Sequence, residues 1–148
     1  MTVSLPMRDA LREQFPHHTT LDTRWMDNDA YGHVNNVVYY SFFDTVVNRW
    51  LIERGVLAVE SSSAIGLVVE TKCEYFSPLT SPDRVAAGLR VAHIGTTSVR
   101  YEIGLFRNDD TTIAAAGHFV HVYVDRASRR PIKVPDSVRA ALATLIAT

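Results

Sequence analysis

A stretch of mostly apolar residues between Asn35 and Arg54 stands out from the rest of the chain. Its few polar side chains recur at helical spacing and form one stripe. Gly55 follows directly, and a glycine at that place commonly ends a helix. The pattern predicts a helix over residues 35–54 that is apolar around most of its circumference and must be enclosed by other parts of the chain. The stripe consists of Ser41, Asp44, Thr45, Asn48 and Arg49.

The rest of the chain is dominated by stretches with β character. A Thr-rich segment over residues 17–26, with Leu21 and Trp25 at alternating apolar positions, predicts a first strand before the helix. Four further runs follow the helix. The third of these alternates clearly, with Val99, Tyr101, Ile103 and Leu105 on one face. The four runs cover residues 66–76, 84–93, 97–106 and 112–124.

The connections between the later strands indicate how they pair. Gly95-Thr96 and the segment 108–110 are short and turn-like, so antiparallel pairing is expected. Residues 135–146 predict a last helix, with Pro135 at or near its first position. We therefore expect an α+β domain over residues 1–148, with a short N-terminal arm over residues 1–16. In this domain a curved antiparallel sheet wraps around one long central helix.

Composition and charge narrow the class of protein. The chain has 148 residues, 47% of them hydrophobic, and a formal net charge of −1. That charge argues against a nucleic-acid binder, which would carry a basic face. No run approaches the roughly 18 apolar residues of a membrane helix, and residues 1–15 lack the apolar core of a signal peptide. A single cysteine, Cys73, cannot form an internal disulfide. By elimination we expect a cytoplasmic protein without membrane partners.

The candidate chemistry lies in the turn before the long helix. Residues 24–36 read Arg-Trp-Met-Asp-Asn-Asp-Ala-Tyr-Gly-His-Val-Asn-Asn. Asp27 and Asp29 are two residues apart, and Gly32 permits a tight backbone path. The helix that follows opens with free N–H groups and the positive end of its dipole. A carboxylate beside such an oxyanion-stabilising helix start suits attack on a carbonyl.

This segment resembles the 4-hydroxybenzoyl-CoA thioesterase-like branch of the hotdog-fold superfamily, in which Asp-x-Asp-x-x-Gly-His-Val-Asn-Asn precedes an aromatic-rich helix. The resemblance covers roughly residues 17–145. It includes residues 75–79 (Tyr-Phe-Ser-Pro-Leu), the turn at residues 95–98, and Val124-Asp125 leading to Arg130-Pro131. It implies a hotdog fold, hydrolysis of a thioester, and homodimers or homotetramers with active sites at subunit interfaces.

The resemblance also implies roles for individual residues. The catalytic aspartate of the family maps onto Asp29, and the backbone N–H that polarises the thioester carbonyl maps onto about Asn36. A CoA thiol has a pKa near roughly 8.5, so it leaves as a thiolate without a strong acid. Asp29 could attack the carbonyl directly or activate water, and the sequence leaves both open. Asp27 is expected to be structural.

Several other residues are candidates for contact with the substrate. His33 could orient substrate or water, and Asn35 could contact substrate or cap the helix. Tyr31 and Tyr39, with Tyr40 and Phe43, could line an acyl pocket, although a wrapped helix needs apolar residues in any case. The cluster over residues 126–130, Arg129 and Arg130 in particular, could bind CoA phosphates or be a solvated loop.

Other functions are weighed against hydrolysis. A non-catalytic acyl-CoA-binding domain would not need a carboxylate at the thioester, and an enoyl-thioester hydratase would carry a different Asp/His signature on the helix. His118 and His121 lie three apart on a strand and so face opposite ways, which argues against a metal site. We expect no cofactor, since CoA is part of the substrate. The acyl group and the carrier, CoA or an acyl carrier protein, stay open.

Overall fold

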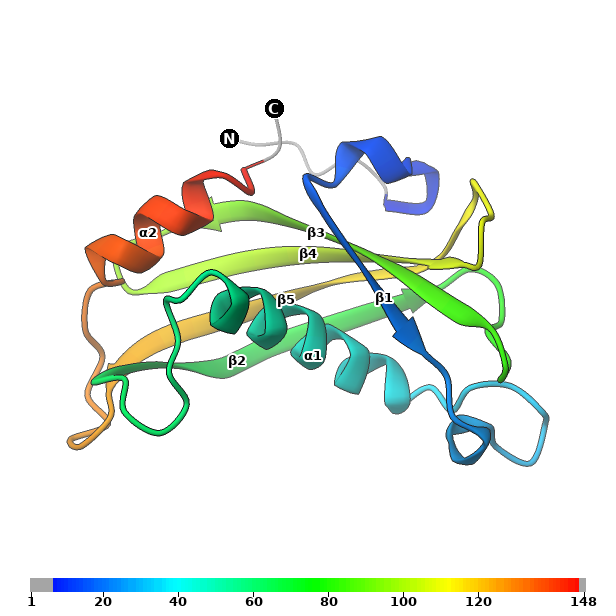
Figure 1. The fold of residues 1–148 in the computed structure, drawn as a ribbon, viewed down its shortest axis with the longest axis horizontal. Coiled ribbons are helices and arrows are strands. Elements are labelled where there is room, and N and C mark those ends of the chain that lie inside the picture. Colours follow the sequence, from blue (N-terminus) through cyan, green and yellow to red (C-terminus); the bar gives the residue numbers. More distant parts are fainter. Residues whose placement is uncertain (1–6, 147–148) are drawn as a thin grey trace.

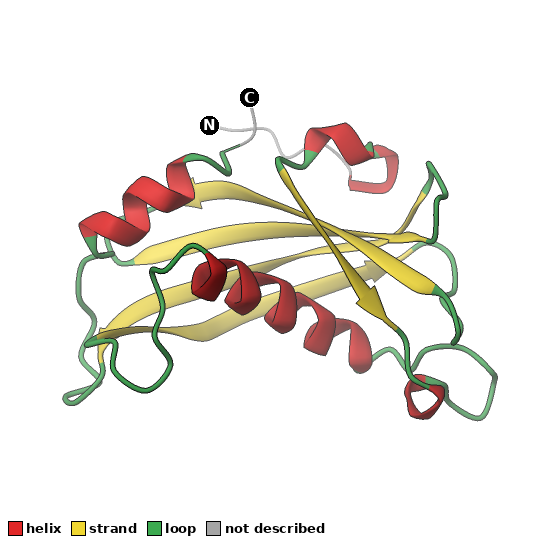
Figure 2. Ribbon diagram, in the orientation of Figure 1, coloured by secondary structure: helices red, strands yellow, loops and turns green. Residues whose placement is uncertain are grey.

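The computed structural model describes residues 7–146, and the first six residues of the expected N-terminal arm lie outside that range. Five antiparallel strands form one curved sheet, and the long helix α1 (Val38–Glu53) packs on one face of it (Figures 1 and 2). The curved antiparallel sheet and the central helix expected from the sequence are thus confirmed. The strands are β1 (His17–Asp22), β2 (Ala64–Tyr75), β3 (Arg84–Ile94), β4 (Ser98–Arg107) and β5 (Ile113–Asp125).

The strands lie in the order β1-β3-β4-β5-β2 across the sheet. Strands β3, β4 and β5 form the expected meander, because their short connections leave only antiparallel pairing open. The second strand departs from it, since β2 pairs with β5 and not with β3. The segment between β2 and β3 therefore crosses the sheet, and β2 becomes an edge strand. Within this crossing segment, the Leu79 carbonyl accepts the N–H of Val34 at 2.7 Å, shortly before the start of α1.

Helix α1 begins three residues later than predicted and ends at the expected place. Gly55 follows it with a φ of 72°, a left-handed conformation that glycine adopts without strain. Seven apolar side chains of α1 are buried against the sheet, while Ser41, Asp44 and Thr45 of the polar stripe are exposed. The helix is therefore enclosed only on its apolar side. The buried residues are Tyr39, Phe42, Phe43, Val46, Val47, Trp50 and Leu51.

Strand β4 illustrates why the sheet has two apolar faces. The predicted face with Tyr101 and Ile103 is fully buried against α1. On the opposite face, Phe106 packs with Phe15 in a second, smaller cluster that also contains Ala10 and Ile113. Short helical turns, η1 (Met7–Asp9) and η2 (Arg12–Gln14), carry this N-terminal segment over the sheet. The arm expected before Pro16 thus packs on the sheet wherever the structure describes it.

Two predicted elements are shorter than expected. Strand β1 ends at Asp22, and the 3-10 turn η3 (Trp25–Asp27) replaces its predicted continuation. Trp25 is 81% exposed, because it lies past the last residue that pairs with β3. Helix α2 (Asp136–Ala143) follows Pro135 and packs against β3 through Val138 and Leu142. Within residues 7–146, no helix has both the length and the apolar character needed to cross a bilayer.

Candidate functional site

Asp27 anchors the loop that joins β1 to α1. Its side chain is only 2% exposed and is occupied by Arg24. One carboxylate oxygen accepts the Arg24 backbone N–H at 2.7 Å, and the other accepts the Arg24 guanidinium at 2.9 Å and 3.1 Å. The Asp27 carbonyl accepts the N–H of Asn35 at 2.8 Å, which closes the loop on itself. These contacts fit the structural role that the sequence suggested for Asp27.

Asp29 lies in the same loop with a different set of contacts. Its Oδ1 accepts the backbone N–H of Tyr31 at 2.8 Å, and its own N–H donates to the carbonyl of His33 at the same distance. Gly32, with a φ of 80°, allows the chain to reverse between them. In the described part of the chain, the second carboxylate oxygen has no hydrogen-bond partner. Asp29 is therefore held in a defined orientation with one oxygen free.

The start of α1 lies directly after this loop. Asn35 organises it, because its side-chain oxygen accepts the Val37 N–H at 3.1 Å and its carbonyl accepts the Val38 N–H at 2.9 Å. The backbone N–H of Asn36 has no acceptor among residues 7–146. A free N–H beside the positive end of a helix is a suitable donor to an oxyanion.

A pocket of about 360 Å³ brings Asp29 and Asn36 together with the end of β2. Tyr75 closes one side of this pocket. Its hydroxyl donates to the Asn36 carbonyl at 2.9 Å, and its ring packs edge to face on the Tyr39 ring, with 4.8 Å between the two ring centroids. Burial raises the pKa of the Tyr39 hydroxyl, and the nearby negative charge of Asp29 acts in the same direction. The remaining lining residues are His33, Val34, Phe76, Ser77 and Pro78.

The sequence had not singled out Tyr75 or Phe76 for this pocket. Both belong to the segment that carried part of the family resemblance, but nothing local in residues 75–79 indicates contact with residues 29–36. The pairing of β2 with β5 at the edge of the sheet brings the end of β2 to the start of α1 and creates that contact. On the other face of the sheet, the guanidinium of Arg8 lies 5.1 Å from the centre of the Phe76 ring, where Phe76 packs on the N-terminal cluster.

Only some of the other residues predicted to contact the substrate lie at the Asp29 pocket. His33 and Tyr39 line the pocket, whereas Asn35 stabilises the helix start and Tyr31 is 86% exposed beside it. Arg129 and Arg130 lie after the end of β5, while Tyr75 pairs with Ala115 near its beginning. At about 3.3 Å per residue, ten residues of strand separate the two ends by about 33 Å. The fold therefore does not bring these arginines to the Asp29 pocket of the same chain.

The two histidines and the cysteine discussed above lie apart from this pocket. His118 faces one side of the sheet and contacts Glu70, with 3.1 Å between Nε2 and Oε2, while His121 is buried on the α1 side. Burial raises the pKa of Cys73 to about 11, which disfavours the reactive thiolate. No group of three His, Cys, Asp or Glu side chains in residues 7–146 has the arrangement of a metal site.

Comparison with known proteins assigns the class of this fold. The family model of the thioesterase-like superfamily matches residues 23–142, which include the Asp29 loop, α1 and the whole of β2 to β5. The chain belongs to the thioesterase-like superfamily, and it is a thioester hydrolase with the hotdog fold. The fold, the family and the reaction class expected from the sequence are therefore confirmed.

Solved structures of similar proteins cover almost the whole chain. The PA5185 protein of Pseudomonas aeruginosa is 53% identical, with a TM-score of 0.90 over 93% of this chain and 96% of that one. PA2801 of the same organism, a putative thioesterase, is 32% identical, with a TM-score of 0.80 over 87% and 99%. A Thermus thermophilus thioesterase crystallised with coenzyme A and zinc is 28% identical, with a TM-score of 0.75 over 90% and 96%.

Curated relatives include a plant acyl-acyl carrier protein thioesterase. The chloroplastic acyl-acyl carrier protein thioesterase ATL3 of Arabidopsis thaliana is 26% identical over 129 residues, which is 84% of this chain. The chain spans 66% of the length of that relative.

Proposed function

We propose that this protein hydrolyses an acyl-CoA to a free carboxylic acid and CoA, with Asp29 as nucleophile or general base. The observation that supports this most directly is the arrangement at the start of α1. A carboxylate held by one oxygen and free at the other shares a pocket with an unoccupied backbone N–H, that of Asn36. These are the two groups that hydrolysis of a thioester needs, since its leaving group departs without help from an acid.

The steps follow from these two groups. Asp29, or a water molecule that gives its proton to Asp29, attacks the thioester carbonyl carbon. The carbonyl oxygen becomes an oxyanion that accepts the Asn36 N–H. When this intermediate collapses, the carbon–sulfur bond breaks and CoA leaves as a thiolate. Direct attack leaves a mixed anhydride on Asp29 that a second step hydrolyses, whereas water attack yields the acid at once. His33 lines the same pocket and is the candidate to orient the water.

One observation supports CoA as the carrier and a small-molecule substrate. The similar Thermus thermophilus thioesterase was crystallised with coenzyme A. Arg129 and Arg130 are too far from Asp29 in the same chain, so in this proposal they would contact CoA only from another copy. The Arabidopsis relatives make an acyl carrier protein the alternative carrier to test.

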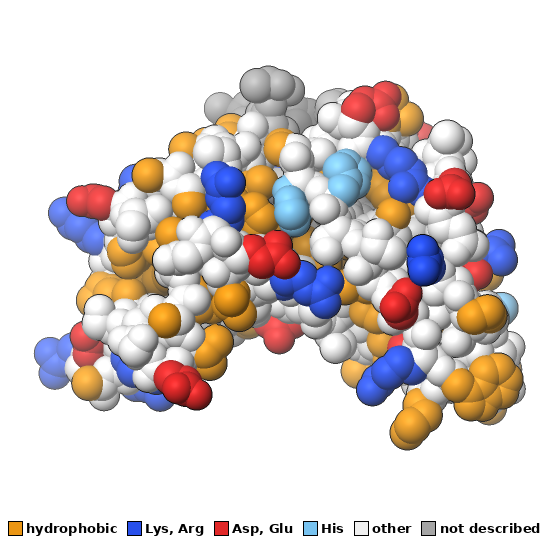
Figure 3. Space-filling model, viewed as in Figure 1, with side chains coloured by type: hydrophobic (Ala, Val, Ile, Leu, Met, Phe, Trp, Pro, Cys, Tyr) orange, Lys and Arg blue, Asp and Glu red, His pale blue; other side chains and the backbone are white. Residues whose placement is uncertain are grey.

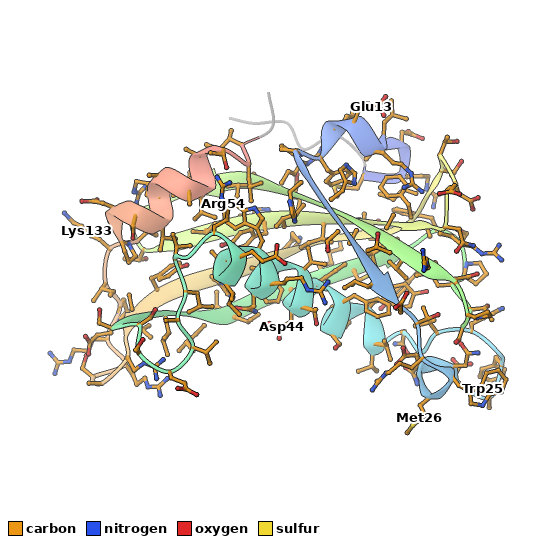
Figure 4. The ribbon with its side chains drawn as sticks, viewed as in Figure 1. Glu13, Trp25, Met26, Asp44, Arg54 and Lys133 are labelled. Carbon is orange, nitrogen blue, oxygen red and sulfur yellow. The ribbon has the colours of Figure 1, made fainter. Side chains whose placement is uncertain are left out.

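The proposal includes a homodimer, or a tetramer built from such dimers, formed through β2. One edge of β2 pairs with β5, and the other edge pairs with no strand in the described structure. Its central side chains Leu67, Val68 and Val69 are apolar and 39%, 45% and 60% exposed. A long, apolar, unpaired edge strand is a surface that proteins normally cover. Trp25 and Met26, which point away from the body in Figure 4, add apolar surface beside the Asp29 loop.

The test is release of thiol from short, medium, long and aromatic acyl-CoAs, and from matched acyl carrier protein thioesters, by wild type and Asp29→Asn. We expect turnover on at least one acyl-CoA and a loss of about 10²–10⁴-fold in kcat for Asp29→Asn, since a positioned base or nucleophile contributes about that much. Near-normal turnover of Asp29→Asn would refute the assigned mechanism. Turnover of carrier-protein thioesters alone would refute CoA as the carrier.

Asp27→Asn is the matched control, because it makes the same chemical change two residues away. Its carboxylate is occupied by Arg24, so its loss weakens hydrogen bonds to a charged group, worth about 1–2 kcal/mol of folding free energy. We expect a lower midpoint of denaturation with turnover per folded molecule within a few-fold of wild type. Equal losses of turnover in both variants would indicate that the loop, and not Asp29, had been damaged.

A further inference from the structure

Asn36 has an unusual set of backbone contacts at the start of α1. In a regular helix its carbonyl would accept the N–H of the residue four places on, which is Tyr40. Here the Tyr40 N–H donates instead to the Val37 carbonyl at 3.2 Å. The donor that reaches the Asn36 carbonyl comes from the sheet, since the Tyr75 hydroxyl donates to it at 2.9 Å. Within residues 7–146, this is the single hydrogen bond that the Asn36 carbonyl accepts.

Packing contributes little to holding this turn in place. Asn36 is exposed, and the Val37 side chain is 66% exposed. The loop between β1 and α1, which leads into the turn, forms the lower right corner of the molecule in Figure 3, where apolar side chains lie on the surface. The orientation of the turn therefore depends on its hydrogen bonds.

Tyr75 is itself held by the sheet. It lies at the end of β2 and pairs with Ala115 of β5. Just beyond it, the N–H groups of Phe76 and Ser77 both donate to the Ala114 carbonyl, at 2.8 Å and 3.0 Å. A phenol titrates near roughly 10, so at neutral pH the hydroxyl carries its proton and is the donor. The sheet thus presents this donor from a well-anchored strand end.

The two peptide planes that meet at Asn36 are held by different partners. The plane before it contains the Asn36 N–H and the Asn35 carbonyl, which accepts the N–H of Val38 at 2.9 Å within the turn. The plane after it contains the Asn36 carbonyl, which Tyr75 holds. Because peptide planes are rigid, only the two dihedral angles at Asn36 remain free between them. The contact with Tyr75 therefore helps to fix the direction of the Asn36 N–H.

We infer that Tyr75 is a positioning residue for the proposed hydrolysis, in that its hydroxyl holds the Asn36 carbonyl and so keeps the Asn36 N–H in place for the oxyanion. The inference rests on the proposed function, because Tyr75 has this role only if that N–H meets the oxyanion. A donor of this kind accelerates a reaction when it is oriented before the charge develops. Since its hydroxyl is occupied by the Asn36 carbonyl, Tyr75 acts through Asn36 and not on the substrate itself.

Tyr75→Phe tests this role, because it removes the hydroxyl and keeps the ring. We expect kcat to fall about threefold to tenfold, the fold-change that one hydrogen bond contributes. The loss is smaller than the roughly 10²–10³-fold cost of deleting an oxyanion donor, since the Asn36 N–H is still present. KM should stay within about twofold of wild type, because this N–H matters most once the oxyanion has formed.

Tyr101→Phe is the matched control, since it makes the same chemical change in the core. The Tyr101 hydroxyl is buried and has no hydrogen-bond partner in the part of the chain that the structure describes. We expect its removal to leave both kcat and KM at the wild-type values. A measurement by NMR then examines the contact itself, whatever the activity. In Tyr75→Phe, the carbonyl carbon signal of Asn36 should shift, and the order parameter of its N–H should fall below the value of about 0.85 that is typical of rigid backbone. Tyr101→Phe should change neither.

Unchanged Asn36 signals in Tyr75→Phe, or changed signals without a fall in kcat, would overturn the positioning role. A higher KM with an unchanged kcat would overturn it as well, because it would indicate that the hydroxyl contributes to substrate binding instead. Asp29→Asn distinguishes these results from a failure of the proposed function. If Asp29→Asn loses turnover while Tyr75→Phe keeps its kcat, only the positioning role fails. Near-normal turnover of Asp29→Asn would refute the proposed function itself, and the inference with it.

Discussion

Individual residues in this protein acquire different roles from nearly identical local sequence. Asp27 and Asp29 lie in one loop, yet Arg24 occupies the first carboxylate and the second keeps a free oxygen in the pocket. The difference arises because η3 turns the Asp27 side chain back onto its own N-terminus, as a helix cap does. Sequence spacing pointed to the pair, and the direction of each side chain separates their roles.

His121 gives a prediction for stability against pH. Burial lowers its pKa to about 4 in the folded protein, whereas an exposed histidine in the unfolded chain titrates near 6.5. Between these values only the unfolded chain binds the proton, so the free energy of unfolding falls as pH falls from 6.5 to 4. The contribution is about 3 kcal/mol at most.

Urea denaturation of wild type and His121→Phe between about pH 4 and pH 7 measures this contribution. We expect the stability of wild type to fall more steeply over that range than the stability of His121→Phe, with all other titrating groups shared. Parallel curves for the two proteins would contradict the assignment of a neutral, buried His121.

At the scale of elements, β2, β5 and α1 come into close contact at Gly117. A Cβ at this position would lie 1.8 Å from the Lys72 carbonyl oxygen of β2 and 2.8 Å from the Phe43 ring of α1. Since the Lys72 carbonyl is backbone, it cannot move aside without breaking the pairing of the two strands. Gly117 thus allows β5 to approach both the edge strand β2 and the helix α1 at this point.

Gly117→Ala should therefore lower the free energy of unfolding by about 3 kcal/mol, or prevent folding. Gly95→Ala is the matched control, because there the only atom within 3.0 Å of the new Cβ is the hydroxyl of Ser98, which can rotate. We expect that control to change stability by less than about 1 kcal/mol. Chemical denaturation followed by circular dichroism measures both, and similar effects would contradict the close approach at Gly117.

At the scale of the whole molecule, the unpaired edge of β2 predicts association. Val69→Asp places a charge on the exposed apolar edge and should convert the oligomer to monomers without unfolding them, because the side chain is 60% exposed. Leu11→Asp, at 46% exposure on the N-terminal arm, is the control and should leave the mass unchanged. Analytical ultracentrifugation distinguishes them. A monomeric wild type would contradict the predicted oligomer.

The sequence by itself determined most of the secondary structure and pointed to the candidate site, because hydrophobic periodicity and turn chemistry are local properties of the chain. The alternation of β4 and the apolar helix before Gly55 predicted their elements within a few residues. The loop over residues 24–36 pointed to Asp29 and Asn36 as the chemical centre and, by resemblance, to the family. Strand β1 was predicted too long, since a Thr-rich extended segment does not reveal where its pairing partner stops.

The tertiary structure alone decided what lies together across the sequence. The pairing of β2 with β5 placed Tyr75 on Asn36, 39 residues away, and Gly66 against His121. No local pattern encodes these contacts, because they depend on the path of the chain across the sheet and on the close approach that Gly117 allows. The chemistry of the Asp29 loop is therefore determined by local sequence, while the walls of its pocket are set by packing between distant strands.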